Sequence, residues 1–70
     1  MTMPQERAPD TIAFEAVEVI DEEPHALLCV IDGEEHWIAK HLIAGSEVAR
    51  KGDRGRLVIP SWLANDYRLI

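Results

Sequence analysis

The first hydrophobic stretch of the chain alternates like a β-strand, but its alternation changes phase part-way along. Ile12 and Phe14 fall in one phase, whereas Val17 and Val19 fall in the other. Successive side chains of a strand point to opposite faces, so a single regular strand cannot bury both pairs together. The pattern therefore predicts a β-bulge or a sharp bend near residues 15–16, the alternative being one face that is less strictly patterned.

The next apolar run, ALLCVI at residues 26–31, is uninterrupted. Such a run is typical of a strand that is buried on both faces. The segment at residues 21–24 separates it from the first strand with three acidic residues and Pro24. Proline cannot donate a hydrogen bond to a sheet, so this segment is predicted to end the first strand in a turn.

Asp32 and Gly33 lie between ALLCVI and a second strand-like segment, EEHWIA. Asp-Gly between two such runs favours a two-residue hairpin, because a type I′ turn needs positive φ at both central positions. This register places Leu28 opposite Trp37, an aromatic–aliphatic pair that stabilises hairpins. Trp37 is accordingly predicted to be a core residue.

The segment after the hairpin contains short ordered pieces and turn residues. Leu42 and Ile43 are predicted to form a turn of 3₁₀ helix, and Val48 is predicted to be buried. Glycine-containing stretches at 45–46 and 52–55 are predicted to be turns. Residues 56–60, RLVIP, form a further short strand that the proline ends.

The last ten residues, SWLANDYRLI, favour a helical turn with Ser61 as its N-cap, and a final edge strand is the alternative. In the helical interpretation Trp62, Leu63 and the final pair, residues 69–70, fold back on the sheet.

Short strands, tight turns and few helix signals predict an all-β fold with a short C-terminal helical turn. The leading architecture is a small SH3-like barrel of four to five antiparallel strands, and an OB-like partial barrel is the alternative. Residues 1–10 are predicted to be a flexible tail, and residues 11–70 are predicted to form one domain. A helix between the third and fourth strands, usual in OB folds, has no good candidate here.

Charge divides the 70-residue chain into two parts. Its net charge is −6; ten of the thirteen acidic residues lie in residues 1–39, whereas six of the seven Lys and Arg residues lie in residues 40–70. Phosphate binding needs a basic footprint, so direct nucleic-acid binding by the whole molecule is disfavoured.

No apolar run is long enough to span a membrane. The single cysteine allows no disulfide within the chain, and this favours a cytoplasmic location.

The sequence gives little support for a catalytic site or a metal site. Cys29 lies within the apolar run and is predicted to be buried and inert, although the hairpin register places it opposite His36. His36 and His41 would point to opposite faces of a strand, so they cannot share a metal ion. We expect no enzyme activity, no cofactor and no metal site.

The acidic residues are the candidate binding site. They are expected to form a line of carboxylates on one side of the sheet that docks on a basic protein surface. The simpler interpretation is that they keep a small domain soluble and block edge-to-edge pairing. The candidate residues are Glu15, Glu18, Asp21, Glu22, Glu23, Asp32, Glu34 and Glu35.

A basic segment is the rival site. Its cations surround predicted turns and would contact single-stranded nucleic acid, with an aromatic residue stacking on a base. A third hypothesis is a homodimer formed by pairing of a sheet edge. The rival residues are Arg50, Lys51, Arg54 and Arg56.

The motifs DGEEHWIAKHLI, SEV and GDRGRLVIPSWLA, within residues 32–64, resemble a group of very short bacteriophage and prophage proteins. That group shows a pattern close to DGxxxWIP[KR]SxI, SEV and GDxGxLV[IV]xxW[LF]A. The present chain departs from it at Ala39 and His41, where the pattern has proline and serine. The resemblance implies an accessory protein of the bacterial cytoplasm, and by analogy an inhibitor that occupies a host surface as anti-CRISPR proteins and DNA mimics do.

Overall fold

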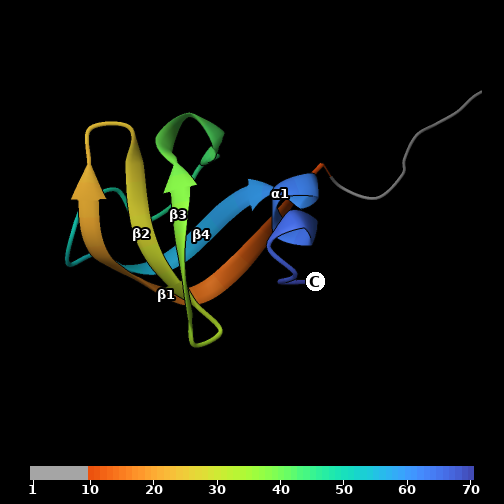
Figure 1. The fold of residues 1–70 in the computed structure, drawn as a ribbon, viewed down its shortest axis with the longest axis horizontal. Helices are drawn as coiled ribbons and strands as arrows, with labels where there is room; N and C mark the ends of the chain where they lie inside the picture. Colours follow the sequence, from red (N-terminus) through yellow and green to blue (C-terminus); the bar gives the residue numbers. More distant parts are fainter. Residues whose placement is uncertain (1–9) are drawn as a thin grey trace, which may run out of the picture.

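The computed structural model describes residues 10–70, and residues 1–9, most of the predicted tail, lie outside the described part. Four strands form one antiparallel sheet in the order β3-β2-β1-β4, and a short helix follows the last strand (Figure 1). The elements are β1 (Thr11–Glu23), β2 (Ala26–Ile31), β3 (Glu34–Ala39), the 3₁₀ turn η1 (Lys40–Leu42), β4 (Arg54–Pro60) and α1 (Ser61–Asp66). The prediction of a small four-stranded antiparallel fold with a C-terminal helical turn is confirmed.

The sheet is strongly curved (Figure 1), but it does not close into the predicted barrel, because β3 and β4 are its two edges. The loop between η1 and β4 occupies the free edge of β4 instead. The Ala44 N–H donates to the Val58 carbonyl (2.8 Å), and the Glu47 N–H donates to the Arg56 carbonyl (2.9 Å). Return bonds run from the Val58 N–H to Ser46 Oγ (2.8 Å) and from the Arg56 N–H to Glu47 Oε1 (3.0 Å). These contacts satisfy the main-chain groups that closure against β3 would have used.

The predicted bulge near residues 15–16 is confirmed. Phe14 pairs with Leu57 and Val17 pairs with Gly55, so two residues of β1 oppose Arg56 alone. A second irregularity at Ile20 was not predicted; there the pairing steps from Val19 and Cys29 directly to Asp21 and Leu28. The bulges bend β1 and allow side chains from both halves of the strand to enter one core.

Ala16 adopts a left-handed backbone conformation within the first bulge, with φ of 56°. This conformation costs a residue with a Cβ about 1–2 kcal/mol, and glycine avoids most of that cost. We therefore expect Ala16→Gly to raise the free energy of unfolding by about 1 kcal/mol, measured by urea denaturation with circular dichroism. The matched control is Ala13→Gly in the regular part of β1, which should lower it by about 0.5–1 kcal/mol. Equal destabilisation by both changes would contradict the left-handed assignment.

The prediction that the acidic segment after Ile20 ends the first strand is wrong. β1 continues to Glu23, and only Pro24 and His25 form the turn before β2. The side chain of Glu22 is held by groups distant in sequence, described below, and this tertiary contact outweighs the weak strand preference of acidic residues.

The Asp32-Gly33 hairpin forms as predicted. Asp32 has φ of 52° and Gly33 has φ of 82°, which are the two positive values that a type I′ turn requires. Leu28 pairs with Trp37 in the expected register. The predicted 3₁₀ turn follows β3 and includes Leu42, although Ile43 lies just beyond it.

The core lies on one face of the sheet, which we call the inner face. α1 and the 43–53 loop contribute side chains to it, including the predicted Val48, which is buried. The other face, the outer face, has no element packed on it among residues 10–70. The fully buried core residues include Val17, Val19, Leu27, Cys29, Ile31, Ile38, Leu57 and Ile59.

Two predictions about tryptophan are wrong. Trp37 lies on the outer face with 39% of its surface exposed, because Ile38 rather than Trp37 takes the inward position of β3. Trp62 is 56% exposed on α1, whereas its neighbour Leu63 is buried. Likewise β2 is not buried on both faces, since Leu28 and Val30 on its outer side are only half-buried.

The helical alternative for the C-terminus is confirmed, with one change. Pro60 occupies the N-cap position in an extended conformation, so Ser61 is the first helical residue and not the cap. Leu69 packs against the core, whereas Ile70 is 60% exposed. No helix in the described part of the chain is long and apolar enough to cross a membrane.

Candidate protein-docking face

The strand registers define the side chains that share the outer face. Glu18, Val30 and Glu35 form one row across β1, β2 and β3, because Glu18 pairs with Val30 and Val30 pairs with Glu35. The next row contains Asp21, Leu28 and Trp37. A third row begins with Glu23, opposite Ala26. Apolar side chains thus occupy β2 and the middle of β3, with carboxylates along β1 and at Glu35.

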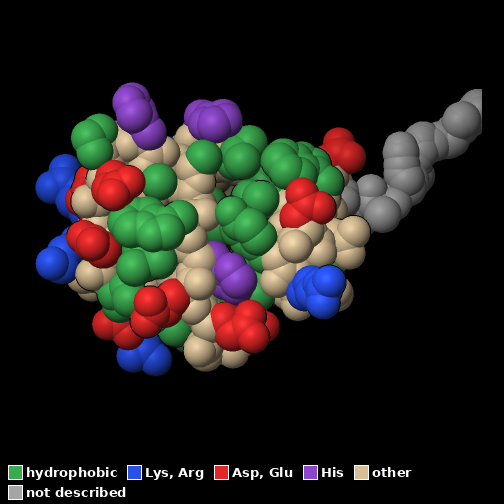
Figure 2. Space-filling model, in the orientation of Figure 1, with side chains coloured by type: hydrophobic (Ala, Val, Ile, Leu, Met, Phe, Trp, Pro, Cys, Tyr) green, Lys and Arg blue, Asp and Glu red, His purple; other side chains and the backbone are tan. Residues whose placement is uncertain are grey.

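Figure 2 shows this arrangement as hydrophobic side chains over β2 and β3 with acidic side chains beside and below them. Trp37 is the largest exposed side chain of the face, and it lies beside the half-buried Leu28. A hydrophobic centre with a charged rim is the usual anatomy of a protein–protein interface. The outer face therefore has the chemical character of a docking surface.

The eight acidic candidates do not all lie together. Glu18, Asp21, Glu23 and Glu35 share the outer face. Glu15 lies at the first bulge of β1, and its carboxylate is already paired with Arg56 on β4 (3.0 Å). The remaining three lie elsewhere: Glu22 is opposite the inward-facing Leu27, Asp32 is in the hairpin turn, and Glu34 contacts His36 (3.3 Å).

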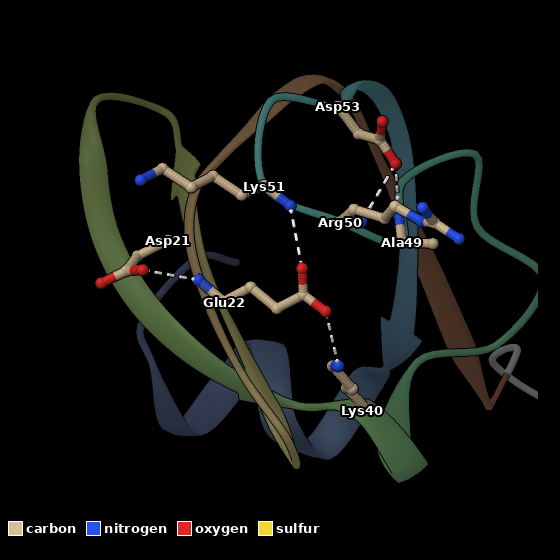
Figure 3. Close-up of polar contacts among 7 residues, drawn as sticks. All are labelled: Asp21, Glu22, Lys40, Ala49, Arg50, Lys51 and Asp53. Carbon is tan, nitrogen blue, oxygen red and sulfur yellow. Dashed lines mark hydrogen bonds and ion pairs between the residues drawn. The ribbon is translucent and has the colours of Figure 1, made fainter.

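Glu22 has a structural role. Its carboxylate accepts a hydrogen bond from Lys40 Nζ (2.9 Å) and another from the Lys51 N–H (3.4 Å), so it joins the end of β1 to η1 and to the 43–53 loop (Figure 3). The Lys40 ammonium and the Lys51 N–H hold the pKa of the Glu22 carboxyl below its ordinary value of 4.5. The contact therefore persists above about pH 4.5 and weakens as the carboxyl protonates at lower pH.

Asp53 organises the same loop. Its carboxylate accepts the N–H groups of Ala49 (2.8 Å) and Arg50 (3.0 Å) (Figure 3). The Val19 N–H donates to the Asp53 carbonyl (2.9 Å), which ties the loop to β1. The SEV and GDRG motifs are thus used largely to build the loop, and the side chains of Ser46, Glu47 and Asp53 are engaged within the fold.

The rival basic segment is divided between two elements. Arg50 and Lys51 lie exposed in the loop, and Arg54 and Arg56 lie on β4. Arg56 is paired with Glu15, and Arg54 is opposite Glu18 across the β1–β4 pairing. Carboxylates beside two of the four cations reduce the local positive potential that phosphate binding needs.

Cys29 and His36 are cross-strand neighbours as predicted, but the thiol is directed at its own strand. Cys29 Sγ contacts the Leu27 carbonyl (3.8 Å), and burial raises the pKa of the thiol to about 11. His36 stacks on Tyr67, with ring centroids 4.8 Å apart, and Tyr67 Oη donates to the Trp37 carbonyl (2.9 Å). The thiol is therefore protonated near neutral pH, and the imidazole serves to hold the C-terminal segment against β3. Within residues 10–70 no group of three or more potential ligands could hold a metal ion.

An open cavity of about 330 Å³ lies between the sheet and the 43–53 loop. Its apolar lining includes Leu27, Ile43 and Val48, and Lys40 is its one charged lining residue. Because Lys40 is bonded to Glu22, the cavity presents no free charge to a ligand.

The sequence pattern identified the acidic residues of the face but missed its tryptophan. The one sequence feature that bears on the exposure of Trp37 is the apolar run of β2. Leu28 and Val30 are as hydrophobic as the inward residues of that run, so the sequence does not indicate which side of the sheet is covered. Comparison of the chain with protein-family models, with curated proteins and with solved structures finds no significant match, which leaves the outer face as the feature from which a function is inferred.

Proposed function

We propose that this chain is a non-enzymatic accessory protein of the bacterial cytoplasm, of the kind that bacteriophages and prophages encode. Its outer face docks on a basic, nucleic-acid-binding surface of a host complex and inhibits that complex by competing with phosphates. The viral context comes from the resemblance of residues 32–64. The docking role is supported by one observation: four carboxylates, three along β1 and one on β3, share with an exposed tryptophan a sheet face that no described element covers.

The spacing of the carboxylates suits a surface that binds nucleic acid. Glu18, Asp21 and Glu23 follow one another along β1 at intervals of two or three residues. Because Ile20 is a bulge residue, Glu18 and Asp21 lie opposite β2 residues that are two apart, so both intervals are roughly 7 Å at about 3.3 Å per residue. A nucleic-acid strand carries one charge for about every 3.4 Å of its axis, so the carboxylates match about every second phosphate.

A dimer through the same face is disfavoured by charge. A second copy would bring the same four carboxylates to the interface, and this added negative charge would be unfavourable there. The carboxylates of the outer face would attract a basic partner, whereas they would repel a second copy of the chain.

Chemical-shift mapping by NMR separates the docking proposal from its rivals. The ¹⁵N-labelled chain is titrated with a peptide that alternates about six lysines with glycine and serine, and separately with a short single-stranded DNA. We expect the peptide to shift amides of β1, β2 and β3 around the outer face, and to bind at least about tenfold more weakly when salt rises from about 0.05 M to 0.3 M.

Shifts confined to Arg50, Lys51, Arg54 and Arg56 with the DNA, and none on the outer face with the peptide, would instead support single-strand binding. Light scattering of the unliganded chain tests the dimer hypothesis. A peptide that shifts residues scattered over the whole molecule would contradict a defined docking face.

A further inference from the structure

Trp37 is placed where a flat cation could be held between an aromatic ring and carboxylates. It lies two residues from Glu35 along β3, about 7 Å at the usual rise, and two strands from Asp21, about 10 Å at the usual spacing. Leu28 lies between Trp37 and Asp21 and provides an apolar floor. An aromatic ring and an apolar floor thus lie next to two carboxylates, that of Glu35 along β3 and that of Asp21 across the sheet.

The carboxylates around Trp37 retain capacity for a ligand. In the described part of the chain, no hydrogen bond or ion pair engages the side chains of Glu18, Glu23 or Glu35. Asp21 Oδ1 accepts the Glu22 N–H (2.8 Å), which uses only part of its capacity. A carboxylate accepts about four hydrogen bonds in total, so each of the four can receive a donor from a partner.

We infer that the outer face recognises an arginine side chain of its partner, with the guanidinium stacked on Trp37 and hydrogen-bonded to the neighbouring carboxylates. This inference rests on the proposed docking function and specifies the group that the face binds. A guanidinium is planar and weakly hydrated, so it stacks on an indole while its in-plane N–H groups remain free for carboxylates. A lysine ammonium gains the charge attraction but lacks the planar stacking and the bidentate geometry.

The test compares two peptides of equal length and charge, one with about six arginines and one with about six lysines, each carrying the same fluorescent label. Binding to the full chain is measured by fluorescence anisotropy. We expect the arginine peptide to bind roughly fivefold more tightly or better. In a Trp62→Phe chain, where Trp37 is the only tryptophan, we also expect the arginine peptide to change the tryptophan emission.

Variants of Trp37 separate stacking from a general preference for arginine. Trp37→Leu should lose most of the preference for the arginine peptide and keep only the part that bidentate contacts with the carboxylates supply, whereas Trp37→Phe should keep more of it because it keeps an aromatic ring. A preference that persists unchanged in Trp37→Leu would overturn the inference.

Failure of the inference and failure of the docking proposal give different results. If the original chain binds both peptides equally well, the face acts through charge alone, and only the arginine inference is overturned. If neither peptide binds at low salt, the docking proposal is overturned with it.

Discussion

Ile38→Ala is expected to destabilise the domain severely, whereas Trp37→Ala, one position earlier on the same strand, is expected to be tolerated. Ile38 is completely buried in the core, and truncating such a side chain to alanine typically costs about 2–5 kcal/mol. A domain of this size has roughly 3.5–10 kcal/mol of stability in total, so much of it would be lost. Trp37 contributes mainly its cross-strand contact with Leu28, worth about 1 kcal/mol or less.

Urea denaturation followed by circular dichroism measures both changes, and each variant serves as the control for the other. If Trp37→Ala cost as much as Ile38→Ala, Trp37 would be a core residue, as the hydrophobic pattern predicts. That result would require another element to cover the outer face and would remove the basis for docking there. The expected tolerance is also what allows Trp37 variants to report on binding without unfolding the chain.

Features fixed by local chemistry could be predicted from the sequence. The Asp32-Gly33 turn depends on the φ preferences of two adjacent residues, and the paired register of Leu28 with Trp37 follows from the length of that turn. The bulge near residues 15–16 was visible because Phe14 and Val17 cannot both face the core along one regular strand.

Features decided by tertiary packing could not be predicted in the same way. Both phases of the β2 run are apolar, so its sequence cannot indicate that α1 and the 43–53 loop cover only the side of Leu27 and Cys29. The extension of β1 through Glu22 depends on Lys40, which is 18 residues away in the sequence. The open sheet depends on Ser46 and Glu47, whose side-chain oxygens take the place of a strand along β4.

The same distinction applies to the candidate site. The clustering of acidic residues in the first half of the chain was evident, but their division between faces depends on the second bulge. Because Ile20 is inserted opposite the β2 ladder, Asp21 lies opposite Leu28 on the outer face and Glu22 lies opposite Leu27 on the inner one. A regular β1 would exchange those two faces and would place Asp21 and Glu23 on the inner side and Glu22 on the outer one. The bulge therefore determines which acids lie on the outer face.

Neutralising the four outer-face carboxylates is expected to abolish docking without unfolding the chain. The variant combines Glu18→Gln, Asp21→Asn, Glu23→Gln and Glu35→Gln. Each carboxylate is exposed, and each exposed ion pair with a basic partner contributes up to about 1 kcal/mol. Four pairs at about 0.5–1 kcal/mol each give about 2–4 kcal/mol, which corresponds to a rise of roughly 30- to 1000-fold in the Kd for the lysine peptide.

A matched control changes the net charge equally but leaves the outer face intact. It combines Asp10→Asn, Asp32→Asn, Glu34→Gln and Asp66→Asn, all at exposed positions away from that face. At about 0.15 M salt the Debye length is about 8 Å, so distant charges are largely screened, and the control should change the Kd by no more than about threefold. Equal losses in the two quadruple variants would show that the peptide responds to net charge alone. In that case the acidic residues serve solubility, and the arrangement around Trp37 has no role in recognition.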